Sequence, residues 1–153
     1  MAIIAAILYA PVMWWRSSHA AEDRDYAATL FAGRLPVDEV LASRRWNRAL
    51  IWDCTFAVVR LDNDAPHIPA TWRTDRRAFD FGGDWRRTPA PPLPQATRDA
   101  VASCANQIPP EVARELAVAL AAPGGWFTRE PPGEVVQVYA PGMRLAAKIR
   151  YGD

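Results

Sequence analysis

The chain has 153 residues, half of them apolar, and its charges nearly balance at a net +1. That length is enough for one ordinary hydrophobic core and short for two, so we expect a single main domain. The balanced charge excludes a global field that would recruit nucleic acid or an anionic membrane. Any electrostatic partner must therefore be recognised by a local patch.

The N-terminal region begins with an uncharged run at residues 2–15, AIIAAILYAPVMWW. As a helix it would cover about 21 Å, short of the roughly 30 Å of hydrocarbon in a bilayer. In Ser18-His19-Ala20, Ser18 and Ala20 are small residues at the two positions that a signal peptidase recognises before its cleavage site. We therefore expect residues 1–20 to be a signal peptide cleaved near Ala20, and the mature domain, 21–153, to be periplasmic or secreted. The alternative is a retained membrane anchor or a buried N-terminal helix, because no basic residue precedes the run.

The two cysteines, Cys54 and Cys104, both lie on apolar faces of expected elements. In an oxidising compartment they would form one disulfide closing a loop of about fifty residues, worth roughly 4 kcal/mol on the chain-entropy model. In a cytosolic protein, two buried thiols are the simpler interpretation. Neither cysteine belongs to a C-x-x-C pair, so a zinc or redox centre is not expected.

The clearest strand pattern covers residues 49–61, ALIWDCTFAVVRL. Its apolar residues alternate, and Ala57 and Val59 add apolar character to the second face, so both faces are expected to be partly covered. One face carries Leu50, Trp52, Cys54, Phe56 and Val58.

Four short helices are expected around this strand. The first covers 21–31, where an acidic first turn precedes apolar residues at helical spacing. The second follows Pro36 over 37–46, since Val37, Val40 and Leu41 recur as on a helix face. The third follows a Thr97 cap, and the fourth follows Pro110 and ends at Pro123.

The C-terminal residues 134–151 predict a β-hairpin around Pro141-Gly142, a pair suited to the centre of a type II turn. Its last strand alternates apolar residues with Arg144, Ala146, Lys148 and Arg150, and we expect that basic face to be solvated at a sheet edge. The fold class is therefore α+β: a small antiparallel sheet of strand 49–61 and this hairpin, with about four short helices on one face.

Between these elements, residues 62–95 form a long irregular loop that interleaves aromatic residues with arginines. Such residues stack on rings and pair with phosphate or carboxylate groups. The candidate binding residues are Trp72, Arg73, Arg76, Arg77, Trp85, Arg86 and Arg87. The competing interpretation is that the aromatics pin the loop to the domain while arginines pair with the neighbouring aspartates.

Catalytic patterns are sparse: no Walker A, H-E-x-x-H or G-x-S-x-G motif occurs, and no metal or cofactor is expected. We expect a non-catalytic exported accessory protein, a small subunit docked on a protein partner in the cell envelope. One alternative is a binding module for an anionic glycan, lipid headgroup or nucleic acid through residues 72–87. The other is a hydrolase with a carboxylate pair that sequence does not reveal. Membrane contact would involve residues 2–15.

Overall fold

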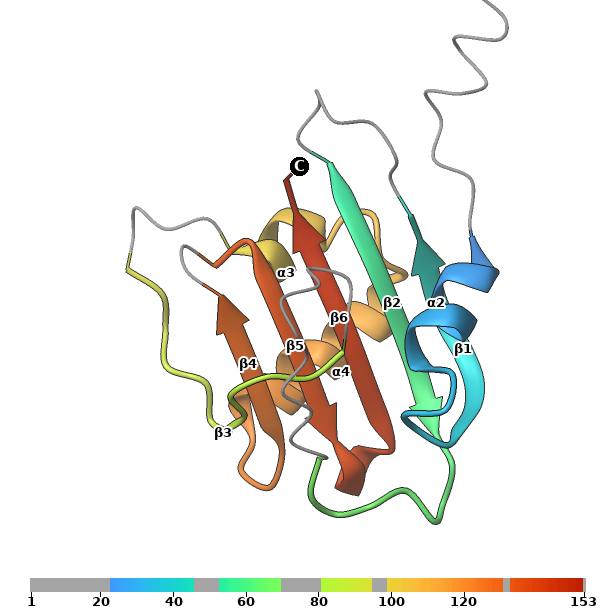
Figure 1. The fold of residues 1–153 in the computed structure, drawn as a ribbon. Helices are drawn as coiled ribbons and strands as arrows, with labels where there is room; N and C mark the ends of the chain where they lie inside the picture. The colour runs from blue at the N-terminus through green and yellow to red at the C-terminus, as the bar shows by residue number, and fades with distance from the viewer. Residues whose placement is uncertain (1–22, 46–52, 70–80, 95–98, 131–132, 153) are drawn as a thin grey trace, which may run out of the picture.

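The computed structural model describes residues 23–45, 53–69, 81–94, 99–130 and 133–152. Six antiparallel strands form one sheet in the order β1-β2-β6-β5-β4-β3 (Figure 1). In chain order the elements are α2 (Arg24–Phe31), β1 (Val37–Arg44), β2 (Cys54–Leu61), β3 (Arg86–Arg87), α3 (Ala100–Cys104), α4 (Pro110–Ala121), β4 (Trp126–Glu130), β5 (Val135–Ala140), the 3-10 helix η1 (Pro141–Met143) and β6 (Leu145–Tyr151). The α+β class is confirmed.

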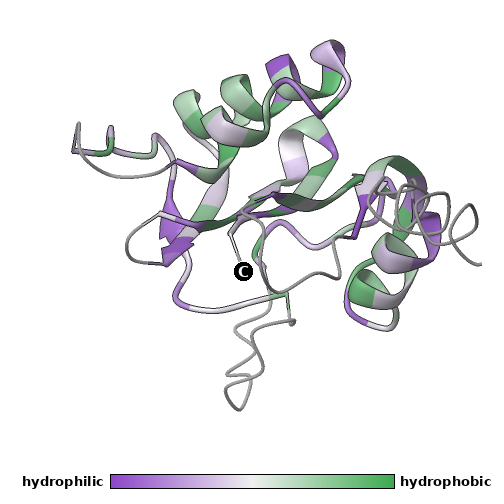
Figure 2. Ribbon diagram, turned by 90° about the horizontal axis from the view of Figure 1, so that it is seen from above, coloured by the Kyte–Doolittle hydropathy of each residue, from purple (hydrophilic) through white to green (hydrophobic). Residues whose placement is uncertain are grey.

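Helices cover both faces of the sheet, not one as expected (Figure 2). Helices α3 and α4 bury Cys104, Val112 and Leu116 against one face. Helix α2 and the segment from Phe81 to Trp85 cover part of the other face. The described residues hold three α-helices, so the expectation of about four was also wrong.

Strand β2 accounts for this arrangement, because its two faces are both apolar. Cys54, Phe56 and Val58 pack under α3 and α4. Ala57 and Val59 pack on the α2 side. The expected two-sided burial of this strand is confirmed from Cys54 onward, and Leu50 and Trp52 lie outside the described residues.

The helix expected over 37–46 is wrong, since residues 37–44 form the edge strand β1. The pairing of β1 with β2 shifts register twice, between Val37 and Glu39 and again between Val40 and Ala42. Each such bulge adds a residue and interrupts the alternation of faces. The remaining apolar residues, Val37, Val40 and Leu41, therefore have the spacing of one helix face.

Helix α2 is fastened to this edge strand by Ser43. The Ser43 hydroxyl accepts a hydrogen bond from the Ala27 backbone N–H at 3.1 Å and donates one to the Asp23 carbonyl. The Asp23 carboxylate in turn caps the helix by accepting from the Tyr26 N–H. These bonds satisfy groups that a helix start leaves unpaired.

The C-terminal hairpin is present, but its turn differs from the expected type II turn. Pro141–Met143 form a 3-10 turn, and the left-handed residue is Arg144, with φ of 52°. Two hydrogen bonds to Leu61 hold Arg144 in this conformation. The Arg144 carbonyl accepts from the Leu61 N–H at 2.7 Å, and the Arg144 Nε donates to the Leu61 carbonyl at 2.8 Å. An ion pair with Asp38 at 2.6 Å completes the contact.

The last strand, β6, lies in the middle of the sheet between β2 and β5. Its outer face is therefore not solvated as expected, and Lys148 is only 3% exposed. Lys148 pairs across the sheet with Gln137, which pairs with Thr128. These three buried polar residues form a row across β6, β5 and β4.

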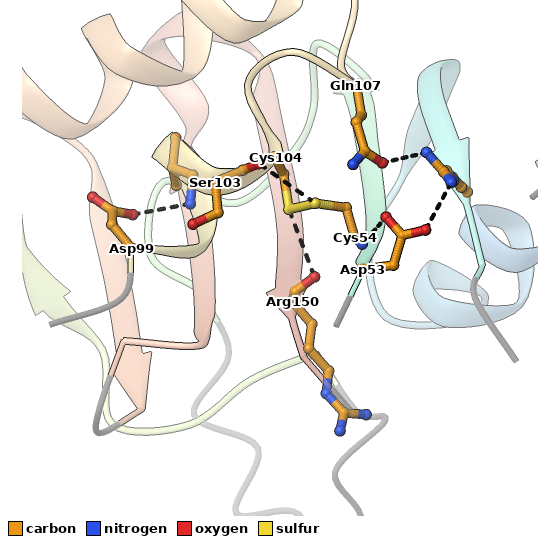
Figure 3. The surroundings of a disulfide bond; sticks show 9 residues. Asp53, Cys54, Asp99, Ser103, Cys104, Gln107 and Arg150 are labelled. Atoms are coloured by element: carbon orange, nitrogen blue, oxygen red, sulfur yellow. Dashed lines mark hydrogen bonds and ion pairs between the residues drawn. A yellow bond between two sulfur atoms is a disulfide. The ribbon is translucent and has the colours of Figure 1, made fainter. Parts of the chain in front are cut away.

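The predicted disulfide between Cys54 and Cys104 is confirmed, with an S–S distance of 2.15 Å (Figure 3). It joins β2 to the end of α3.

The cap of α3 is Asp99, whose carboxylate accepts from the Val101 N–H at 2.9 Å. Thr97, the expected cap, lies outside the described residues. On the other side of the disulfide, Arg44 bridges Asp53 and Gln107.

Candidate functional site

The seven candidate binding residues divide into two groups. Trp72, Arg73, Arg76 and Arg77 lie outside the described residues. Trp85, Arg86 and Arg87 are described, and the structure gives them different environments.

Trp85 packs in an aromatic cluster on the α2 side of the sheet. Its ring centroid lies 5.3 Å from that of Phe81 and 6.4 Å from that of Tyr139, and Phe81 in turn meets Phe31 at 5.0 Å. The Tyr139 hydroxyl donates to the Pro66 carbonyl, and burial raises the pKa of Tyr139 above its ordinary value. Trp85 therefore fastens the loop to the sheet, as the structural interpretation of this loop predicts.

Arg86 and Arg87 form the two-residue edge strand β3, and both are exposed. They pair with Phe127 and Trp126 of β4. The guanidinium carbon of Arg87 lies 3.8 Å from the centroid of the Trp126 ring, a close cation–π contact. Within the described part of the chain, neither arginine forms an ion pair.

Trp126 joins this edge to a second loop, because its indole N–H donates to the His67 carbonyl at 3.3 Å. The next residue, Ile68, is 64% exposed, the most exposed of the large apolar side chains described. We call this surface the edge patch: Ile68, Arg87 and Trp126. Arg86 pairs with Phe127, so its side chain lies on the opposite face of the sheet. Ile68 and Trp126 were missed from the sequence, since only the β3–β4 pairing and the indole bond bring them near Arg87.

A groove of about 410 Å³ lies on the opposite side of the sheet, between α3, α4 and the segment Ala90–Leu93. Among the residues that the structure describes, its lining is apolar except for Asp99 and Arg129. The segment is held by a bond from the Ala90 N–H to the Leu120 carbonyl at 2.8 Å. Arg129 holds it too, by donating from Nη1 to the Pro91 carbonyl at 2.8 Å.

Another hollow, of about 430 Å³ between α2 and β1, contains Asp38 and Glu39. Both carboxylates are exposed, and Asp38 is engaged by Arg144. A glycoside hydrolase needs two carboxylates facing a shared substrate. Neighbouring residues of one exposed edge strand, one of them ion-paired, do not supply that arrangement here.

Across the described ranges, no three His, Cys, Asp or Glu side chains come together as a metal site would require. In the same ranges, none of the helices has the length and apolar character to cross a bilayer. Comparison with models of known protein families, with curated proteins and with solved structures found no match.

Proposed function

We propose that the protein is a non-catalytic, exported accessory subunit that docks on a larger assembly of the cell envelope, and that the edge patch is its contact surface. The observation that carries this proposal is the Arg87–Trp126 stack with exposed Ile68 beside it. Trp and Arg dominate the binding energy at protein interfaces, and an exposed aliphatic side chain next to them adds apolar area.

The charges of the patch suggest the chemistry of its partner. Arg87 is exposed and forms no ion pair with a described carboxylate, whereas Arg60 and Arg144 each hold one. An apolar partner surface that carries carboxylates would complement the patch. The disulfide supports export, because disulfides persist in oxidising compartments.

The proposal is tested by purifying the full chain from its own cells and measuring the mass of the native particle. We expect a partner in a fixed ratio, and we expect both Ile68→Ser and Arg87→Glu to release it. Val118→Ser and Arg114→Glu are matched controls, since both residues are exposed on α4, on the other side of the sheet. A lone monomer, or equal loss from the controls, would contradict the proposal.

A second candidate is a binding module for an anionic glycan, lipid headgroup or nucleic acid. It is favoured by the same stack, because Trp126 orders the Arg87 guanidinium while leaving it exposed. The two functions differ at Ile68. Loss of Arg87 weakens both, but Ile68→Ser weakens only docking on an apolar protein surface.

A further inference from the structure

We propose that the groove between α3, α4 and Ala90–Leu93 binds a single-chain anionic amphiphile, a fatty acid whose carboxylate is held by Arg129. This site lies away from the edge patch and does not depend on the proposed docking function. Its volume of about 410 Å³ falls within the roughly 300 to 1,000 Å³ of ordinary ligand pockets.

The shape of the groove suits a hydrocarbon chain. On α4, Ala113, Ala117 and Ala121 recur every four residues along its wall, and eight helical residues cover about 12 Å. Ala102 and Ala105 of α3 line it too. Small side chains on both walls leave a shallow channel whose surface is methyl and methylene groups, so a chain lying in it would be removed from water.

Arg129 supplies the anchor for the headgroup. Its Nη1 donates to the Pro91 carbonyl, which fixes the guanidinium in place, and its Nε is shielded by the protein. The described residues give Nη2 no hydrogen bond, so Nη2 is the donor that a carboxylate in the groove would engage. A hydrogen bond between a guanidinium and a carboxylate is charge-assisted and therefore strong.

The other charged residue of the groove does not compete for Arg129. The Asp99 carboxylate caps α3 by accepting from the Val101 N–H, and no ion pair joins it to Arg129. Arg129 is therefore a positive charge in an apolar groove without a described carboxylate partner. Charge complementarity selects an anion there and disfavours a cationic or neutral amphiphile.

A protein segment fits the groove less well than a hydrocarbon. An extended peptide carries an N–H and a C=O at every residue, and each needs a partner when buried. Of the lining side chains in the described ranges, two are polar, and both are at least partly engaged. A helix satisfies its own backbone, but at roughly 10 to 12 Å in diameter it would lie over the channel and not within it.

The test is titration of the disulfide-bonded full chain with dodecanoate, below its micelle concentration, followed by amide chemical shifts. We expect shift changes at Ala102, Ala117 and Arg129, and at least tenfold weaker binding of dodecyltrimethylammonium. Arg129→Gln should weaken dodecanoate binding at least tenfold, and Arg129→Lys should recover part of it. Arg87→Gln serves as the matched control and should leave the affinity unchanged, because Arg87 stacks on Trp126 on the other face of the sheet.

A second pair of variants keeps the test independent of the Arg129–Pro91 contact. Ala117→Trp fills the groove and should abolish binding, whereas Val118→Trp, on an exposed position of the same helix, should not. Absence of shifts in the groove, or equal binding of the cationic amphiphile, would overturn the proposal. So would a photocrosslinker at Ala117 that captures a protein chain while dodecanoate leaves the groove unperturbed.

Discussion

Gln137 holds both backbone polar groups of Gly82: its Oε1 accepts from the Gly82 N–H and its Nε2 donates to the Gly82 carbonyl, each at 2.7 Å. The Gln137 amide thus supplies the donor and the acceptor that a neighbouring strand would offer to the Gly82 backbone. Gln137 is 2% exposed and Gly82 is partly buried, so these bonds are partly shielded from water. Together with the Trp85 cluster they fix the start of the segment that leads to β3.

Gln137→Leu should therefore destabilise the protein by about 1 to 3 kcal/mol, because two partly buried backbone groups lose their partners. Urea unfolding measures the loss, and hydrogen exchange at the Gly82 amide should rise with it. Asn106→Leu is the control, since Asn106 is exposed and its replacement should cost less than about 0.5 kcal/mol. Equal losses would show that the Gly82 bonds contribute nothing.

Removing the disulfide should cost about 4 kcal/mol, the value expected for a loop of this length on the chain-entropy model. The cysteines are 50 residues apart, and their replacement by alanine leaves β2 and α3 joined only by packing. Denaturant unfolding of the Cys54→Ala, Cys104→Ala double variant gives the loss. Adding dithiothreitol to the wild type should produce a similar loss, and unchanged stability in both experiments would disprove a stabilising bridge.

The elements that could be predicted from the sequence are those with undisturbed periodicity. Strand β2 alternates cleanly, so its two buried faces and the direction of Cys54 followed from the residues. Helix α4 has proline at its first position and apolar residues at successive turns. In these places local pattern and tertiary packing agree.

The errors arose where tertiary contacts decide the structure. Two bulges removed the strand pattern from β1. Strand β4 has five residues, too few to show a period, and it is stabilised by pairing with β5 and β3. Lys148 looked like a surface charge because nothing in its own strand indicates that β6 lies between two others.

The candidate site was recovered only in part for the same reason. Arg86 and Arg87 could be selected by composition. Trp126, which stacks on Arg87, is about forty residues away in the chain, and Ile68 joins the patch because the carbonyl of its neighbour His67 accepts from the Trp126 indole. No local pattern links these segments.

Glu115 should make stability depend on pH in the acid range. Arg60 binds the Glu115 carboxylate through its Nη1 and Nη2 atoms, at 2.7 and 3.1 Å. This hydrogen bonding lowers the pKa of Glu115 below its ordinary value of 4.5. The unfolded chain then takes up the proton more readily than the folded one. The stabilisation is present above pH 4.5 and is lost as the pH falls through the lower pKa of the folded state.

Because both side chains are partly exposed, the effect should stay below about 1 kcal/mol. Urea unfolding between pH 6 and pH 3 measures it, and Glu115→Gln should flatten that part of the profile. Glu111→Gln, an exposed residue on the same helix, controls for the loss of a charge. Identical profiles for the wild type and Glu115→Gln would refute a role for the pair.

The most direct test of the docking surface is photocrosslinking in the native cells, with the crosslinking residue placed in turn at Ile68, Arg87, Arg114 and Val118. The account predicts one and the same partner protein captured from positions 68 and 87, and none from positions 114 and 118. Charge reversal of Arg87 should abolish the adduct from position 68. Adducts of equal yield from all four positions, or none from the edge patch, would contradict it.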